Sequence, residues 1–421
     1  MKEKILNLIQ HFLQFLARVK VRRAKPKIIA ISGSYGKTTA KEAVFSVLSG
    51  KFGTDVGKNW GNMNSVLGLP LAILGLRSYS FGFGLLGNII QAKWNFLFYH
   101  LPKILVLELG IDKPGEMQEL LSVITPDIAI ITGVSETHLE GLKNLEGVKK
   151  EKNLLIEALG KGGIAIINGS DANSADLKVP EGVKKVTFGT SGADISASDV
   201  QVTTSGTSFN IVMTGKKVFV NSKLIGSHSI QNLLIATVVA NQFQINTLEI
   251  KSALEAVRPQ NGRMNPIKIR DGMIVLDDSY NSNPKSAEEA LLALKEIKYD
   301  GRKVAILGNM NELGAYEQKA HIRVGKAAGE IVGLLIVAGD NAKHLASGAK
   351  EAGLAEDKIK SFSTSEELIE KIDGLIKPHD LILIKGSQNR VRLERLVKYL
   401  VNDNELAGKI LVRQEKKWQG K

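Results

Sequence analysis

Short apolar runs alternate along most of the chain with longer segments in which apolar residues recur at helical spacing. This alternation is typical of α/β proteins whose sheets are largely parallel. The expected strands of a first series are KIIAIS (27–32), ILVLEL (104–109), DIAIIT (127–132) and GIAIIN (163–168).

The pattern changes twice further along the chain. From about 184 to 225 it consists of short β-rich pieces, which predict an antiparallel edge or flap, and helices are expected at 228–243 and 247–256. A turn-rich break at 258–263 then opens a second alternating series, typical of a smaller doubly wound domain. Its expected strands are MIVLDD (273–278), KVAILG (303–308), GLLIVAG (333–339) and DLILIKG (380–386).

With 421 residues, the chain is long enough for two or three domains. We predict an amphipathic helix over 1–26, a central α/β domain with a mostly parallel sheet over 27–260, and a smaller Rossmann-like doubly wound domain over 261–421. An aromatic interval at 77–103 interrupts the central domain, and its polar residues argue against a spanning helix. We expect a hairpin or helix lying against the domain or a membrane surface; an ordinary buried helix pair is the alternative.

The N-terminal segment places its apolar residues on one helical face and clusters basic residues after them. We expect this helix to pack on the central domain, with a membrane-surface helix as the alternative. The apolar positions are Ile5, Ile9, Phe12, Leu16 and Val19.

Composition removes several classes of chemistry. The chain has no cysteine, which excludes disulfides, thiolate metal sites, iron–sulfur clusters and cysteine nucleophiles. The net charge of +13 favours an anionic partner or, equally well, a lysine-rich solvated surface. No interleaving of aromatic and basic residues points to nucleic acid.

The segment ISGSYGKTTAKE (31–42) follows an apolar run and leads into a helical pattern. Glycines in such a loop let backbone N–H groups approach phosphate oxygens, and the helix that follows adds the positive end of its dipole. A lysine would pair with the β- and γ-phosphates and a threonine hydroxyl would reach Mg²⁺. Ile31 stands where the strict Walker pattern has its first glycine. The predicted ATP-binding residues of the loop are Gly33, Ser34, Gly36, Lys37, Thr38 and Thr39.

The shortened loop with paired threonines resembles that of the Mur ligase family. Further stretches, in the same order as in the family, resemble its MurF type. They are GNMNSVLGLP (61–70), LELGIDKPGEM (107–117), SETHLEGLKNLEGVKKEK (135–152), GSHSIQN (226–232), NGRMNP (261–266), LDDSYNSNP (276–284), LGNMNELG (307–314) and LIKGSQ (383–388).

The resemblance implies an ATP- and Mg²⁺-dependent ligase that forms an amide bond through an acyl phosphate. In the MurF type, the substrates are a UDP-MurNAc-peptide and D-Ala-D-Ala. It also implies a monomer that acts on small molecules in the cytoplasm. The sequence shows no convincing Ser–His–Asp nucleophile, and acyl-phosphate chemistry needs none.

Several residues acquire roles through this resemblance. Glu108 ends a strand at the carboxyl edge of the sheet, where its carboxylate can bind a hard cation. The family pattern puts Glu108 and His138 on a second Mg²⁺ ion, although a lone histidine is more often structural. Lys152 matches the lysine that CO₂ carbamylates, which turns a cation into a carboxylate-like metal ligand. Lys150 is the competing position, and from pattern alone a solvated helix face is the more usual explanation of this lysine-rich segment.

The remaining assignments concern the nucleotide and the second substrate. In isolation, a turn explains DDSYNSNP nearly as well as a binding role does. The resemblance places Lys37, Lys152 and His138 at the catalytic centre. It implies nucleotide contacts for His228, Asn232, Arg263, Asp278, Tyr280 and Asn281, and substrate contacts for Asn62, Asn64, Lys385, Ser387 and Arg390.

The chain departs from the family in three places. Only about 26 residues precede the first strand, so we expect it to lack the domain that usually binds the UDP-sugar. The interval 77–103 looks inserted, and Ser229 stands where asparagine is more usual. The rest of the chain would then hold the UDP-sugar, or the enzyme would add an amino acid to a different, membrane-associated acceptor.

Two other classes of function remain to be weighed. A nucleotide-binding scaffold without catalysis would have no reason to combine Lys37, Thr38, Glu108, His138 and Lys152. A phosphate-loop kinase or motor ATPase would not need the matches in the second domain.

Overall fold

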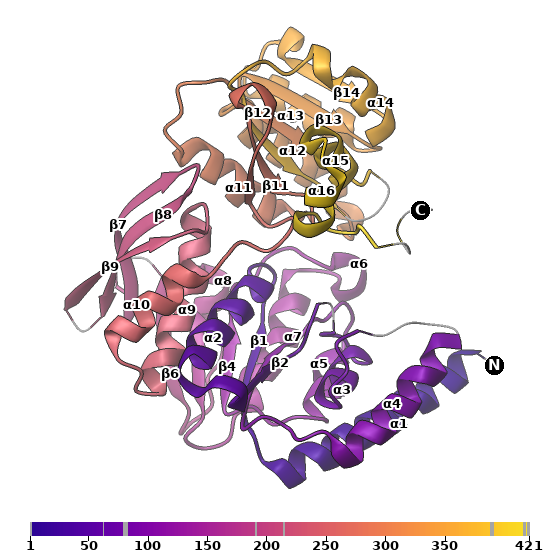
Figure 1. Cartoon of the computed structure of the whole chain (residues 1–421), viewed down its shortest axis with the longest axis vertical. Helices are drawn as coiled ribbons and strands as arrows, with labels where there is room; N and C mark the ends of the chain where they lie inside the picture. Colours follow the sequence, from indigo (N-terminus) through magenta and orange to yellow (C-terminus); the bar gives the residue numbers. More distant parts are fainter. Residues whose placement is uncertain are drawn as a thin grey trace. The chain divides into compact units, whose positions relative to one another are not determined.

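In this computed structural model, the described residues are 2–61, 63–78, 83–189, 192–213, 215–387, 391–415 and 418, with residues 2–5, 83 and 86 described by backbone alone. The chain forms two compact units (Figure 1). The first comprises Met1–Ser198, Asn210–Val220 and Gln231–Val257. The second comprises Asp199–Phe209, Asn221–Ile230 and Arg258–Lys421.

A nine-stranded sheet organises the first unit, in the order β2-β3-β1-β4-β5-β6-β7-β8-β9. The pairings from β2 to β7 are parallel. Its strands are β1 (Lys27–Ser32), β2 (Val56–Lys58), β3 (Ile104–Glu108), β4 (Ile128–Ile131), β5 (Ile164–Asn168), β6 (Lys184–Gly189), β7 (Ile195–Thr203), β8 (Gly206–Met213) and β9 (Lys216–Ser222).

Helices cover both faces of this sheet. Side chains of α1, α3, α5 and α7 bury against one face, in a core that includes Leu16, Ala30 and Leu155. The alternate residues Ile29 and Ile31 point to the other face, against which α2 packs. The helices are α1 (Lys2–Ala24), α2 (Lys37–Phe52), η1 (Gly53–Asp55), α3 (Gly68–Ile73), α4 (Phe83–Phe98), α5 (Glu116–Leu121), α6 (Leu139–Leu142), α7 (Leu145–Glu157), α8 (Ala172–Ala175), α9 (Ser227–Gln242) and α10 (Thr247–Ala256).

The second unit has a six-stranded sheet in the order β10-β11-β15-β12-β13-β14. The strand β10 is antiparallel to β11, and the other pairings are parallel. The strands are β10 (Asn265–Lys268), β11 (Ile274–Asp278), β12 (Lys303–Leu307), β13 (Leu334–Ala338), β14 (Ile359–Phe362) and β15 (Leu381–Lys385).

Two apolar cores lie on the two faces of this smaller sheet. One packs against α11, α12 and α13, and the other against α14, α15 and α16. The helices are η2 (Arg270–Gly272), α11 (Pro284–Glu296), η3 (Gly314–Tyr316), α12 (Glu317–Gly329), α13 (Ala342–Glu351), η4 (Glu356–Lys358), α14 (Ser365–Lys371), η5 (Ile372–Gly374), α15 (Glu394–Val401) and α16 (Asn404–Ile410).

The predicted α/β class with two mostly parallel sheets is confirmed, and the predicted strands match to within about a residue at each end. The short strands β2, β10 and β14 escaped prediction because none carries a long apolar run. The antiparallel edge expected from about residue 184 is wrong for β6, which pairs parallel with β5 and β7. It holds for β7 and β8, whose two-residue connection permits only antiparallel pairing. Within the described residues, no helix has the length and apolarity needed to cross a bilayer.

Candidate active site

The phosphate loop joins the carboxyl end of β1 to the first residue of α2. Gly33 and Gly36 both adopt positive φ angles, 152° and 73°. A Cβ atom on Gly33 would lie 1.9 Å from the Oγ1 of Thr132, and one on Gly36 would lie 2.7 Å from the Oδ1 of Asn232. Both positions therefore need glycine for space as well as for backbone conformation.

Hydrogen bonds to the segment after β4 hold the loop in place. The backbone N–H of Ser34 donates to the carbonyl of Gly133 at 2.8 Å. The Ser34 hydroxyl donates to the carbonyl of Ser135 at 3.0 Å and accepts from the Thr137 hydroxyl at 3.1 Å. The loop is therefore organised before any phosphate arrives, which lowers the entropic cost of binding.

Lys37 and the two threonines begin α2. The Nζ of Lys37 donates to the carbonyl of Gly33 at 2.7 Å, so this cation lies over the loop that precedes it. Thr38 and Thr39 lie in the first helical turn, where the backbone N–H groups lack partners inside the helix. This combination of a cation, hydroxyls and free amides is suited to the terminal phosphates of a nucleotide.

Glu108 gathers the polar side chains beside the loop. Its Oε1 accepts from the Thr38 hydroxyl at 3.3 Å and from the Nδ2 of Asn64 at 2.8 Å. Its Oε2 lies 3.6 Å from the ammonium of Lys41. The side chain of Asn59 fixes the backbone of Glu108. Its Oδ1 accepts from the N–H of Glu108 and its Nδ2 donates to the carbonyl of Glu108, each at 2.9 Å.

This cluster fits a divalent cation. Glu108 is 3% exposed, and its buried Oε2 atom accepts no hydrogen bond within the described part of the chain. A carboxylate oxygen without a hydrogen bond and a threonine hydroxyl are oxygen ligands of the kind that Mg²⁺ prefers. Phosphate oxygens would complete the coordination of the ion. Thr38 and Glu108 would supply the protein ligands.

Lys152 lies on the buried face of α7 and is 1% exposed. Burial lowers its pKa well below the ordinary value of 10.5, and the nearby positive charge of Lys37 lowers this pKa further. Asp112 and Glu151 act in the opposite direction without restoring the pKa. A neutral amine next to Lys37 is the state that can attack CO₂. The rival position, Lys150, is exposed on the same helix.

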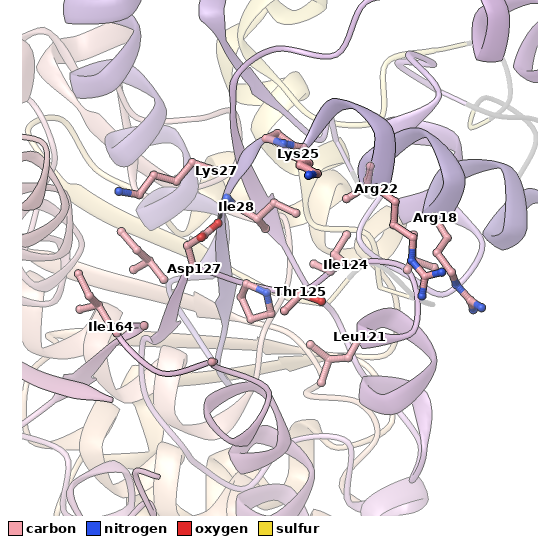
Figure 2. Close-up of a pocket in the computed structure, with 18 of the residues that line it drawn as sticks. Arg18, Arg22, Lys25, Lys27, Ile28, Leu121, Ile124, Thr125, Asp127 and Ile164 are labelled. Carbon is pink, nitrogen blue, oxygen red and sulfur yellow. Dashed lines mark hydrogen bonds between the residues drawn. The ribbon is translucent and has the colours of Figure 1, made fainter. Parts of the chain in front are cut away.

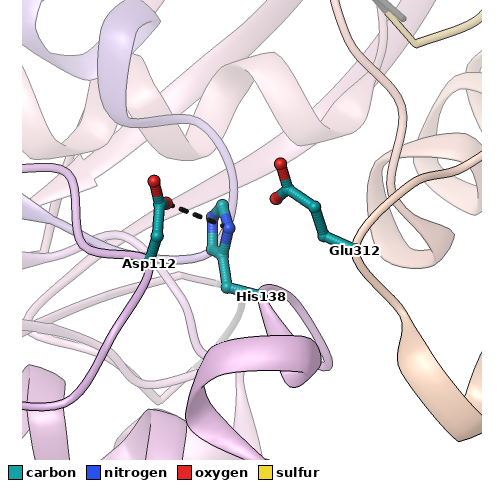
Figure 3. Close-up of side chains that lie close together, drawn as sticks. All are labelled: Asp112, His138 and Glu312. Carbon is teal, nitrogen blue, oxygen red and sulfur yellow. Dashed lines mark ion pairs between the residues drawn. The ribbon is translucent and has the colours of Figure 1, made fainter.

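His138 is the residue that precedes α6. Its φ angle of 54° is unusual for a residue with a side chain. The Nδ1 of His138 lies 3.1 Å from the Oδ1 of Asp112 (Figure 3). The Asp112 carboxylate and the His138 imidazole thus form a pair at the edge of the first unit that carries the phosphate loop.

The second unit has its own polar cluster at the ends of β11 and β15. The Nζ of Lys385 donates to the Oδ2 of Asp278 at 2.6 Å and to the carbonyl of Asn281 at 3.0 Å. The Oδ1 of Asp278 accepts from the N–H of Met264 at 3.2 Å. Lys385 is 2% exposed, so this is a buried ion pair with additional hydrogen bonds.

Two neighbouring groups have shifted pKa values. Burial lowers the pKa of His228 to about 4, with Asp278 opposing this shift and Lys385 adding to it. Burial raises the pKa of Asp277 to about 6, against hydrogen bonds from Ser279. At neutral pH, His228 is therefore uncharged.

The other predicted residues of the second unit surround this cluster. The guanidinium of Arg263 stacks over the ring of Tyr280 at 4.3 Å, and Arg413 lies over the same ring at 5.4 Å. Ser387 is buried and accepts a hydrogen bond from Asn311. Asn62 and Arg390 lie outside the described residues.

The structure adds residues that sequence reasoning did not select. Lys41 and Asn59 fix Glu108, and Asp112 pairs with His138. Lys41 could have been selected from the sequence, because it lies one helical turn after Lys37 and therefore on the same side of α2. Asn59 had none, because asparagine in a loop is ordinary.

Comparison with known proteins places this geometry in a family. Two family models match the chain: the Mur ligase middle domain over residues 31–240 and the Mur ligase, glutamate ligase domain over residues 262–388. The UDP-N-acetylmuramoyl-tripeptide--D-alanyl-D-alanine ligase of Rickettsia prowazekii (strain Madrid E) is 30% identical over 416 residues, which cover 94% of this chain and 84% of the relative.

Solved structures agree with these matches. A crystal structure of MurF from Acinetobacter baumannii superposes with a TM-score of 0.80 at 25% identity, covering 94% of this chain and 81% of that chain. The MurF ligase from Thermotoga maritima in complex with ADP gives 0.77 at 24% identity, covering 93% and 83%. The family models, the relative and the solved structures are all Mur ligases, and the chain belongs to the Mur ligase family.

Proposed function

We propose that the chain is an ATP-dependent ligase that joins D-alanyl-D-alanine to a UDP-N-acetylmuramoyl-tripeptide in the synthesis of peptidoglycan precursors. The observation that carries this proposal is that the first unit combines the phosphate loop with the Glu108 carboxylate, which contacts Thr38, and the buried Lys152 amine. It occurs in a chain that matches a UDP-N-acetylmuramoyl-tripeptide--D-alanyl-D-alanine ligase over 94% of its length. ATP is supplied inside the cell, so we place the reaction in the cytoplasm.

The loop of the first unit would hold the nucleotide phosphates. Backbone N–H groups of the loop and of the first turn of α2 would bind their oxygens, and Lys37 would leave the carbonyl of Gly33 to pair with them. Asn232 lies beside Gly36 and would limit the position of the nucleotide. In the second unit, the stacked pair Arg263 and Tyr280 offers a cation and an aromatic face, groups that suit a nucleotide.

Thr38 and Glu108 would hold one Mg²⁺, because they lie 3.3 Å apart; this assigns Glu108 to a different ion from the second one that the family pattern gave it. His138 together with a carbamate on Lys152 would hold that second ion. When bound, the cations neutralise phosphate charge and favour transfer of the terminal phosphoryl group. The carbamate requires an uncharged Lys152, which its burial and the charge of Lys37 provide. In that step, the Nζ lone pair attacks CO₂, an N–C bond forms, one C=O π bond breaks to place a negative charge on oxygen, and one proton passes from the nitrogen to water.

The ligation itself is balanced as two displacements. An oxygen of the substrate carboxylate attacks the γ-phosphorus of ATP, and ADP leaves. The amine of D-alanyl-D-alanine then attacks the acyl carbon, and phosphate leaves with that carboxylate oxygen. Positive groups held near the phosphates stabilise the charge that develops in both steps.

Phosphate release with defined substrate pairs tests the proposal. We expect ATP turnover to require both the UDP-N-acetylmuramoyl-tripeptide and D-alanyl-D-alanine, and we expect Lys37→Ala to abolish it. Stimulation by a different carboxylate and amine, with none by this pair, would instead identify a Mur-type ligase with another acceptor. Tight ATP binding without turnover on any pair would favour a scaffold.

A further inference from the structure

The face of the first unit that α1 and α4 form is rich in exposed apolar side chains. Half of the large hydrophobic side chains that are exposed among the described residues lie on these two helices or on Tyr99, which follows α4. Scattered apolar residues are normal on a protein surface, but a contiguous patch marks an interaction site.

On α1, the exposed apolar residues form one stripe. Leu8, Phe12 and Phe15 are 73%, 37% and 58% exposed and are spaced four and three residues apart, so they share a face of the helix. The opposite face buries Leu13 and Ala17 in the core of the unit. The helix is therefore apolar on two sides, and packing on the domain explains only one of them.

The helix α4 repeats this arrangement. Ile90, Trp94 and Leu97 are 61%, 65% and 69% exposed and have the same spacing. The rings of Trp94 and Phe98 lie 4.5 Å apart between centroids, which makes the aromatic surface continuous. Ala92 is the residue that α4 buries in the core.

The two stripes belong to one surface. The helices α1 and α4 lie side by side (Figure 1), and the Nζ of Lys20 donates to the carbonyls of Asn95 and Phe96 at 2.8 and 3.0 Å. The Nζ of Lys93 on α4 lies 5.4 Å from the ring centroid of Phe12 on α1. An exposed cation thus lies between the apolar stripes.

Positive charge predominates on this surface, and one acidic residue that contacts it is Glu119, whose Oε2 accepts from the Nε2 of Gln10 on α1 at 2.9 Å. Arg22 and Arg23 are exposed and follow Phe15 by seven and eight residues, so they continue its stripe toward the end of α1. The sequence has no Asp or Glu from Lys4 to Lys41, and none from Val56 to Leu107. All of α4, and α1 from Lys4 onward, lie in these stretches.

A basic cleft of about 820 Å³ opens at the end of α1 (Figure 2). Arg18, Arg22, Lys25 and Lys161 line it. The acidic side chain in its lining is Asp127, whose Oδ2 is occupied by the N–H of Ile28 at 2.7 Å. The cleft has the charge and size to accept a phosphate group.

We propose that α1 and α4 form a membrane-binding face that docks on the surface of an anionic phospholipid bilayer. The apolar stripes would enter the boundary between headgroups and acyl chains, where tryptophan is favoured, and Arg22, Arg23 and the cleft would contact lipid phosphates. The cleft lies at the amino ends of β1 and β4, whereas the phosphate loop follows the carboxyl end of β1. Docking would therefore leave the loop edge of the sheet open to substrates.

Co-sedimentation of the full chain with vesicles tests this proposal without any substrate. We expect binding to vesicles of phosphatidylcholine mixed with phosphatidylglycerol, at least about tenfold weaker binding to phosphatidylcholine alone, and a decrease with salt. Quenching of tryptophan fluorescence by brominated lipids should disappear in Trp94→Phe. Equal binding to both vesicle types, or none to either, would overturn the proposal.

Matched variants separate the two components of the surface. Phe15→Ser with Leu97→Ser, and Arg22→Glu with Arg23→Glu, should each weaken vesicle binding at least about tenfold. The controls are Leu248→Ser, which changes an exposed leucine on α10, and Lys184→Glu with Lys185→Glu, which reverses an exposed basic pair on β6. These controls should bind like the wild type. Equal losses in the controls, or a dimer that forms through α1 and α4 without lipid, would contradict membrane docking.

ATP turnover with soluble substrates serves as the folding check, because none of these residues belongs to the proposed active site. The vesicle assay and the ligase assay therefore test the two proposals independently, and either proposal can be rejected without the other. A chain that binds vesicles without ligating would keep the membrane proposal and reject the proposed function.

Discussion

Two buried lysines show how the same side chain acquires different chemistry in the two units. Lys385 at the end of β15 donates to Asp278 at 2.6 Å, so its charge is neutralised by an ion pair. Lys152 on α7 is equally buried, but Lys37 lies near it and the neighbouring carboxylates do not restore its pKa. Lys385 therefore serves a buried ion pair, whereas the lowered pKa of Lys152 makes its neutral amine available.

The largest effect is expected when the ion pair of the second unit is broken. Asp278→Ala should lower the free energy of unfolding of that unit by about 3–5 kcal/mol, because it leaves the Lys385 ammonium buried without its partner. Guanidinium denaturation followed by circular dichroism measures this loss.

The matched control replaces both partners by apolar residues. Asp278→Leu with Lys385→Met should recover most of the lost stability, because a buried pair exchanged for apolar side chains costs little. If the single variant is as stable as the wild type, the pair does not lie buried as described.

The corresponding change in the first unit should affect activity and leave the fold intact. Lys152→Ala should lower the ligation rate at least about 100-fold, which is about 2.7 kcal/mol in the activation barrier, and short carboxylic acids should restore part of it. The expected Tm of Lys152→Met is at least that of the wild type, because a buried amine is removed.

Lys150→Ala is the control on the same helix. It should ligate at the wild-type rate, since Lys150 is exposed. Wild-type rates in Lys152→Ala would remove the carbamate from the account.

The smallest effect concerns His228, which lies beside the paired lysine. The pKa of His228 is about 4 in the folded chain, below the ordinary value of 6.5. Between these two pH values, the unfolded chain therefore binds a proton that the folded chain does not bind. Wild-type stability should therefore fall as pH decreases from 6.5 toward 4. Asp277, with its pKa raised to about 6, contributes the opposite trend because its folded form takes up a proton first.

Comparison with His228→Gln isolates the histidine. Between pH 7 and pH 5, the variant should gain up to about 2 kcal/mol relative to the wild type, measured by denaturation at each pH. Parallel pH profiles for the two proteins would show that His228 is solvated and titrates normally.

The sequence was sufficient for the long buried strands and the phosphate loop, because these features are local. KIIAIS is strand β1 to the residue, and the glycine-rich loop between that strand and α2 is where the pattern placed it. Apolar runs specify buried parallel strands directly, and the positions of Gly33 and Gly36 follow from the space that a phosphate requires.

The choice between Lys152 and Lys150 as the buried lysine could also be made from local sequence. Lys152 follows Val148 by four residues and precedes Leu155 by three, so it lies on the apolar face of α7, whereas Lys150 does not. Helical phase, rather than the lysine-rich composition, separates the two positions.

Long-range pairing could not be derived in this way. Asp278 and Lys385 are 107 residues apart, and Asn59 and Glu108 are 49 apart. Their contacts depend on strand order in each sheet, which periodicity does not specify. The pKa of His228 depends on the same long-range packing.

The transfer of labelled oxygen tests the central claim most directly. The UDP-N-acetylmuramoyl-tripeptide is labelled with ¹⁸O in its terminal carboxylate and incubated with ATP, D-alanyl-D-alanine and the full chain. If the carboxylate is activated as an acyl phosphate, each amide bond formed should deliver one ¹⁸O atom to the released phosphate, as seen by mass spectrometry. Phosphate released without ¹⁸O would mean that water, and not the carboxylate, attacks ATP, and it would contradict the account.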